Sequence, residues 1–159
     1  MTSVPITPTA PTTVALADLP QHVGTTFGPS AWRTITQEEV NDFADLTGDH
    51  NPIHLDPEVA AQTPFGGTIV HGYLTLSLVV PLMAEILEVT GVTTGINYGL
   101  DRLRFPAPVR VGARIRVLST LREVTEAPGG YQAVFENTFE VEDQAKPGAV
   151  ALMIVRYYG

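Results

Sequence analysis

The chain has 159 residues, no cysteine and a formal net charge of −8, with 44% hydrophobic and 16% charged residues. This length fits one domain with a core large enough to need no covalent staple. The acidic balance argues against nucleic-acid binding, and the lack of cysteine excludes disulfides, thiolate zinc sites and a cysteine nucleophile.

The N-terminal residues 1–13 are rich in proline and threonine, and we expect a disordered arm there, followed by a single domain over residues 14–159. No basic region followed by an apolar run marks a signal peptide, so we expect a cytoplasmic protein. Residues 30–35 have the character of a short strand.

Two helices are predicted by their first residues. Thr36 and Glu39 match a capping box, and the helix that they open should end near Gly48. Asp56 followed by Pro57 has the order of an N-cap and a first helical residue, which predicts a second, short helix.

The segment from Gly72 to about Val89 is apolar on nearly every face, which predicts one buried core helix. Pro81 should kink this helix or remove one of its backbone hydrogen bonds. The segment contains Glu85 and is too short for a clean membrane span, so we expect no membrane anchor.

Four strands are expected in the second half of the chain. They cover residues 96–105, with an irregularity near Asp101, and residues 114–119, 131–141 and 149–158. Pro128-Gly-Gly130 predicts a hairpin turn between two of them. Helices followed by antiparallel strands predict an α+β domain, in which a curved sheet covers the apolar helix.

Asp49 and His54 are the first candidates for catalysis. Gly48 favours a helix end, and Pro52 keeps Asn51 out of the α region, so the chain must turn between the two side chains. A turn can aim a carboxylate and an imidazole at one point, which is the usual equipment for activating water. Asn51 can hold the turn by bonding to the backbone.

Two other readings of this segment stay open. The pair can be a helix-capping aspartate and a core histidine, because structural ion pairs are common. Asp49, His50, His54 and Asp56 can also be metal ligands, but no H-E-x-x-H spacing supports this, and we predict no metal.

Gly72 begins the apolar helix, and the first amides of a helix have no internal partner. Its N–H can therefore meet a developing oxyanion, although a glycine here can equally serve close packing. We read His71 as structural, because Ile69 and Val70 beside it are apolar.

Several arginines lie on or near the predicted strands: Arg102, Arg104, Arg110, Arg114 and Arg116. Such a set is usually a solvated face, but one or two members can pair with ligand phosphates. The sequence contains neither a G-x-S-x-G motif nor a P-loop or dinucleotide fingerprint.

Taken together, the motifs resemble the MaoC-like (R)-specific enoyl-CoA hydratases, a hot-dog family, and their small single-domain NodN-like members. The resemblance lies in ADLTGDHNPIHLD at residues 44–56 and FGGTIVHG at residues 65–72. It continues through residues 96–99 and 104–112 and covers roughly residues 20 to 158.

The resemblance implies a hot-dog fold, a homodimer and a hydro-lyase of fatty acid metabolism that needs no cofactor. Asp49 and His54 would activate water for addition to C3 of a trans-2-enoyl thioester, giving an (R)-3-hydroxyacyl thioester. Asn51 would support the site, and the Gly72 amide would polarise the thioester carbonyl.

The resemblance leaves the substrate carrier open between CoA and acyl carrier protein, and the reaction can run as a dehydration. A non-catalytic acyl-thioester binding module and a hot-dog thioesterase are further alternatives. The acyl pocket is expected to involve Phe65, Leu74, Leu76 and Leu78.

Overall fold

The computed structural model describes residues 10–159, which form eight strands, five α-helices and one 3-10 helix. In chain order the elements are β1 Thr12–Ala15, the 3-10 helix η1 Leu16–His22, β2 Thr26–Phe27, β3 Arg33–Thr34, α1 Gln37–Thr47, α2 Pro52–Leu55, α3 Pro57–Ala61, α4 Gly72–Ser77, α5 Val79–Ala84, β4 Leu87–Thr90, β5 Thr94–Arg104, β6 Arg114–Ala127, β7 Gly130–Val141 and β8 Ala149–Tyr158.

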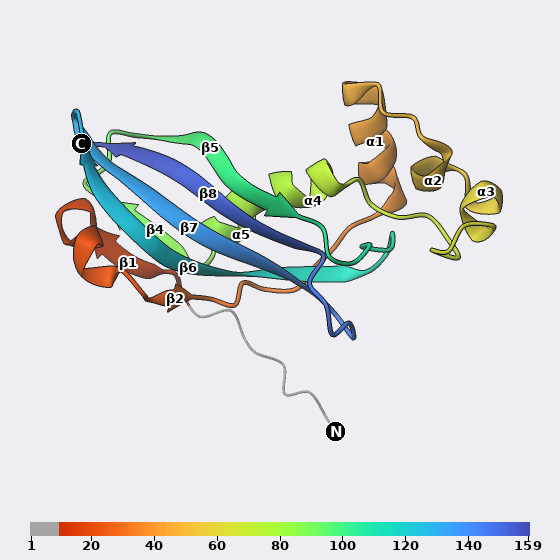
Figure 1. Cartoon of the computed structure of the whole chain (residues 1–159), viewed down its shortest axis with the longest axis horizontal. Helices are drawn as coiled ribbons and strands as arrows, with labels where there is room; N and C mark the ends of the chain where they lie inside the picture. The colour runs from red at the N-terminus through yellow and green to blue at the C-terminus, as the bar shows by residue number, and fades with distance from the viewer. Residues whose placement is uncertain (1–9) are drawn as a thin grey trace.

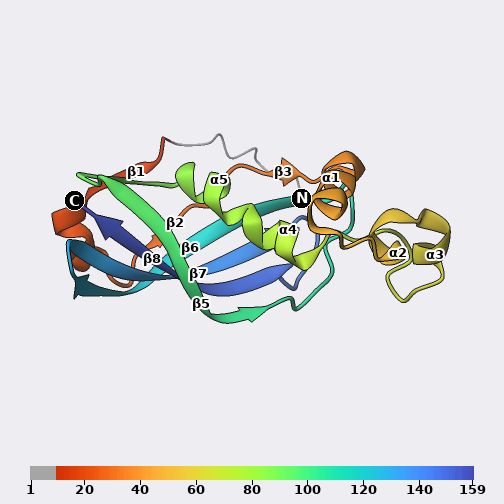
Figure 2. The same ribbon diagram turned by 90° about the horizontal axis from the view of Figure 1, so that it is seen from above.

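The main sheet is antiparallel and runs in the order β2-β6-β7-β8-β5, with β3 also paired to β6. It curves along the molecule, and α4 and α5 lie across one of its faces (Figures 1 and 2). The turn at residues 128–129 joins β6 to β7, as predicted. The register of β5 shifts between Leu100 and Arg102, at the expected irregularity. The α+β prediction is confirmed.

The core lies between the sheet and the two helices, and strict alternation along the strands builds it. On β6 the buried side chains are Ile115, Val117, Ser119 and Leu121, while their neighbours face outwards. β7 and β8 alternate in the same way. This follows from the two-residue period of a strand with one face on the core.

The predicted single helix from Gly72 to Val89 is wrong in its extent. It is divided at Leu78 into α4 and α5, and residues 87–89 belong to β4. Pro81 accounts for the division, since it has no N–H for the carbonyl four residues earlier, at Ser77, and its ring crowds that carbonyl.

The first part of the described chain also differs from expectation. Thr12 and Thr13, placed in the predicted arm of residues 1–13, belong to β1, which pairs in parallel with β4 as a second small sheet. The rest of the arm prediction falls largely on residues 1–9, which lie outside the described residues. Residues 30–35 contain only the two-residue strand β3.

The short helices α1, α2 and α3 gather at one end of the sheet, next to the start of α4 (Figures 1 and 2). This arrangement brings the Asp49–His54 segment to the first turn of the core helix. None of the helices in the described part of the chain is long and apolar enough to cross a membrane.

Candidate active site

The segment that carries the two candidate residues is built by three local signals. Thr36 and Glu39 form the predicted capping box at the start of α1, and Gly48 ends that helix in the left-handed region with φ 78°. The Asn51 carboxamide oxygen accepts the Ile53 N–H at 3.2 Å and caps α2. The chain therefore turns after Gly48, and the single helical turn of α2 presents His54.

His54 is buried, and its ring is held in one orientation. Its Nδ1–H donates to the Ile69 carbonyl at 2.7 Å, because a carbonyl oxygen can only accept. The other nitrogen, Nε2, is then left with its lone pair. Burial lowers the pKa of His54; the Ile69 carbonyl and Asp49 raise it in part, and the neighbouring His71 lowers it further. The imidazole is therefore neutral at pH 7 and able to accept a proton.

Asp49 lies close to two imidazoles. One of its carboxylate oxygens and one ring nitrogen each of His54 and His71 lie within 4.8 Å of one another. The His71 Nε2–H donates to the Asp49 main-chain carbonyl at 3.0 Å. The His71 ring also stacks on the His54 ring, with centroids 3.8 Å apart. The structure thus brings the two predicted side chains together, along with a histidine that the sequence left as structural.

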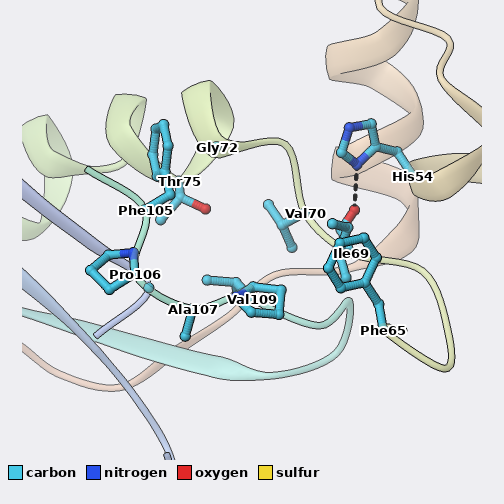
Figure 3. A pocket seen from close by; sticks show the side chains of 12 residues that line it. His54, Phe65, Ile69, Val70, Gly72, Thr75, Phe105, Pro106, Ala107 and Val109 are labelled. Atoms are coloured by element: carbon cyan, nitrogen blue, oxygen red, sulfur yellow. Dashed lines mark hydrogen bonds between the residues drawn. The ribbon is translucent and has the colours of Figure 1, made fainter. Parts of the chain in front are cut away.

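A cavity of about 270 Å³ opens beside His54. Its lining is mostly apolar and comes from distant parts of the chain (Figure 3). The lining residues are His54, Phe65, Ile69, Val70, Gly72, Thr75, Phe105, Pro106, Ala107, Pro108, Val109 and Gly148. An apolar wall around few polar groups is typical of a small-molecule site, and it strengthens electrostatic interactions inside.

Gly72 is both the first residue of α4 and part of the cavity wall. A Cβ on it would come within 2.8 Å of the Phe105 ring, so the glycine is required for close packing. Its amide, at the first position of the helix, has no carbonyl four residues earlier in α4 to bond. Gly72 can therefore serve close packing and, through its N–H, stabilise an oxyanion, so the two interpretations from the sequence are compatible.

The other candidate metal ligands are engaged elsewhere. His50 bonds to Asp45 at 2.9 Å on the surface, and Asp56 caps α3 by accepting the N–H groups of Glu58 and Val59. The set formed by Asp49, His54 and His71 is compact. However, the two imidazole rings are stacked, so an ion in the plane of one ring would lie outside the plane of the other, which disfavours coordination by both histidines.

Three of the five arginines have partners in distant parts of the chain. Arg114 pairs with Glu142 and Arg116 with Glu140, so both belong to a solvated face. Arg110 is exposed and donates to the Gly66 carbonyl at 3.2 Å, which places it against the loop that carries Phe65. It follows Val109, a residue of the cavity wall.

Of the four residues expected in the acyl pocket, only Phe65 lines the cavity beside His54. Leu78 is buried in the core, Leu74 packs against it, and Leu76 lines a separate hollow next to β5. The sequence could not predict which of these leucines line the cavity, because the helix is apolar on nearly every face. Phe105, in contrast, lies within the motif at residues 104–112 and could have been selected there.

The comparisons with known proteins agree with these observations. A family model described as "MaoC like domain" matches residues 18–142. A relative in Mycobacterium tuberculosis named "3-hydroxyacyl-thioester dehydratase Z" is 54% identical, over 90% of this chain and 95% of its own length. "Nodulation protein N" of Rhizobium leguminosarum is 42% identical, over 87% of this chain and 88% of its own.

Among solved structures, an (R)-hydratase from A. caviae "involved in PHA biosynthesis" superposes with a TM-score of 0.70 at 29% identity, over 84% of this chain and 95% of that one. The R-hydratase PhaJ1 from Pseudomonas aeruginosa gives a TM-score of 0.68 at 26% identity, over 86% of this chain and 81% of its own. The predicted hot-dog fold and the predicted resemblance are confirmed: the chain belongs to the MaoC-like family.

Proposed function

We propose that this protein is a hydro-lyase that adds water reversibly to trans-2-enoyl thioesters and gives (R)-3-hydroxyacyl thioesters. The observation that carries the proposal is the neutral imidazole of His54, which lies beside the Asp49 carboxylate and an apolar cavity and whose Nδ1 is held by Ile69. The names of two similar proteins support the same reaction class, because one is a 3-hydroxyacyl-thioester dehydratase and the other an (R)-hydratase.

The spacing of the two side chains suits a single water. The Asp49 oxygen and a His54 nitrogen lie within 4.8 Å and share no direct hydrogen bond among those described. Two hydrogen bonds of about 2.8 Å at a tetrahedral angle span about 4.6 Å, so one water can bond to both groups. Because Ile69, not Asp49, orients the imidazole, we assign Asp49 to holding this water.

The reaction then balances without a cofactor. An O–H bond of the water breaks as the pair takes its proton, and its oxygen forms a bond to C3 of the enoyl group. The electrons of the C2–C3 double bond move toward the thioester carbonyl, whose oxygen becomes an enolate. C2 finally takes up the proton that the pair holds, which restores the starting protonation state, and the same steps in reverse give dehydration.

Gly72 is assigned to the developing charge. Its N–H begins α4 at the cavity wall, and in this assignment it donates to the thioester carbonyl of the bound substrate. A preorganised amide donor of this kind can contribute about 3–4 kcal/mol in the transition state. Asn51 acts indirectly in this assignment, since its side chain caps the turn that carries His54.

We propose a homodimer formed through β5. This strand is an edge of the main sheet, and its apolar side chains Ile96, Tyr98 and Leu100 are 41%, 53% and 42% exposed. An unpaired strand edge with exposed apolar side chains is typical of a protein–protein interface. Sedimentation velocity should give twice the 17.1 kDa chain mass, and a monomer would contradict the proposal.

A panel of enoyl thioesters tests the function. CoA thioesters from C4 to C16 are followed by the loss of the conjugated thioester absorbance, with chiral analysis of the product. The same acyl groups on acyl carrier protein separate the two carriers. Formation of the (R)-alcohol supports the proposal, whereas release of free thiol indicates a thioesterase, and tight binding with no turnover a binding module.

A further inference from the structure

His71 is a buried titratable residue that the mechanism above does not use. It is 2% exposed and precedes Gly72 as the N-cap of α4, yet its side chain makes no capping hydrogen bond. Instead its ring lies between other parts of the site. Its Nε2–H reaches the Asp49 carbonyl, one face stacks on His54, and the Phe43 ring lies 5.0 Å away.

Packing alone does not account for a histidine at this position. With Nε2 donating, Nδ1 carries a lone pair, and this atom is buried with no hydrogen-bond partner among the described residues. A buried polar atom without a partner destabilises a fold, whereas a phenylalanine of similar shape would fill the same space without that cost. The imidazole must therefore supply something that an apolar ring cannot.

What it supplies is a link between three segments that the chain brings together only by folding. The Asp49 main chain lies after α1, His54 lies on α2, and Gly72 is the next residue after His71 on α4. The hydrogen bond to residue 49 fixes the main chain from which the Asp49 carboxylate projects. The stacked ring limits the positions open to His54.

We propose that His71 is a positioning residue that holds the Asp49 main chain and the His54 ring against the start of α4, so that the acid–base pair faces the Gly72 amide. This inference rests on the proposed hydro-lyase function. It predicts that the loss of the His71 N–H displaces Asp49, and a displacement of about 1 Å at a reacting group can cost about 100-fold in rate.

His71 also affects the protonation of its neighbour. Burial is the main reason why the pKa of His54 is lowered, and the adjacent His71 lowers it further, against the Ile69 carbonyl and Asp49. The titratable groups close to His54 are the Asp49 carboxylate and the His71 imidazole. Without the His71 imidazole the pKa of His54 should rise, so the acidic limb of the pH–rate profile should move to higher pH.

Two substitutions separate the hydrogen bond from the stacking. His71→Phe keeps the buried ring but removes the donor, and His71→Gln keeps an N–H that can reach the Asp49 carbonyl but removes the ring. His50→Ala is the control, because this exposed imidazole is adjacent to Asp49 in sequence and is bonded to Asp45. Each variant is compared with the wild type by steady-state hydration of crotonyl-CoA, its pH profile and thermal unfolding.

For His71→Phe we expect an unchanged or higher Tm, a kcat lower by about 10–100-fold and a KM within about threefold of wild type. His71→Gln should recover part of the kcat, both variants should shift the acidic limb upwards, and His50→Ala should match wild type. An active wild type with a fully active His71→Phe would overturn the inference. If His71→Phe does not fold, His71→Leu, which also lacks the donor, takes its place, and a folded His71→Leu with the wild-type kcat and pH profile would overturn the inference. A wild type inactive on every enoyl thioester would refute the proposed function itself.

Discussion

Gly72→Ala adds one methyl group at a crowded point of the cavity wall. The new Cβ would lie 2.8 Å from two carbons of the Phe105 ring and 3.0 Å from a third. Carbon atoms in contact need about 3.5–4.0 Å, so the ring must move by about 1 Å. Phe105 is 42% exposed and lines the cavity, so it can swing outwards, and the cavity changes shape when it does.

The effects on stability and on rate should therefore separate. Overpacking a closed core lowers the free energy of unfolding by about 1–3 kcal/mol. Because the Phe105 ring is partly exposed and can move, we expect a loss of about 1 kcal/mol here. Alanine also favours the helix over glycine by up to about 1 kcal/mol, which offsets part of the cost. We expect a Tm within about 4 °C of wild type. Hydration of crotonyl-CoA should fall about 10–100-fold, because a 1 Å displacement at a reacting site has this effect.

A double-mutant cycle with Phe105→Ala tests the reasoning. Once the ring is gone, the added methyl group has nothing to strike, so Gly72→Ala should raise the Tm in that background through its helix preference. Thermal unfolding of the four proteins gives the coupling between the two positions. Equal changes in Tm from Gly72→Ala in both backgrounds would refute the proposed contact with Phe105.

Three further predictions follow from the same site. Because burial lowers the pKa of His54 from its usual value of 6.5, the acidic limb of kcat/KM should have its midpoint below pH 6.5; a midpoint above pH 6.5 would contradict the lowered pKa. We expect Arg110, which lies against the loop that carries Phe65, to pair with a phosphate of CoA. Arg110→Ala should therefore raise KM for crotonyl-CoA about tenfold but leave KM unchanged for the N-acetylcysteamine thioester, which has no phosphate. Arg122→Ala, which breaks a surface pair with Glu136, is the control and should alter neither KM. Pro52→Ala should lower kcat about tenfold while unfolding measurements show a loss below about 1 kcal/mol, and a loss of stability alone would show that Pro52 does not aim His54.

The parts of the fold that local chemistry controls could be predicted from the sequence. The capping box at Thr36 and Glu39 and the left-handed end at Gly48 depend only on residues close in the chain, and both are present. The alternation in β6 and β7 follows from the two-residue period of a half-buried strand.

Features that depend on distant partners could not be predicted in the same way. Residues 87–89 continue an apolar run and look helical, but they form a strand because β1, more than seventy residues earlier, pairs with them. His71 has apolar neighbours in sequence, and its role depends on the Asp49 loop and α2 folding against the start of α4. The cavity wall at Phe105 arises in the same way, from a loop that packs on Gly72.

Hydration of crotonyl-CoA by the wild type and by Asp49→Asn and His54→Ala tests the central claim most directly. The absorbance of the conjugated thioester gives the rate, and thermal unfolding confirms that each variant is folded. The wild type should produce (R)-3-hydroxybutyryl-CoA, and each substitution should lower kcat by at least about 100-fold, the size expected when a general acid–base group is lost. Folded variants that both hydrate crotonyl-CoA at the wild-type rate would contradict the assignment of Asp49 and His54 as the groups that activate water.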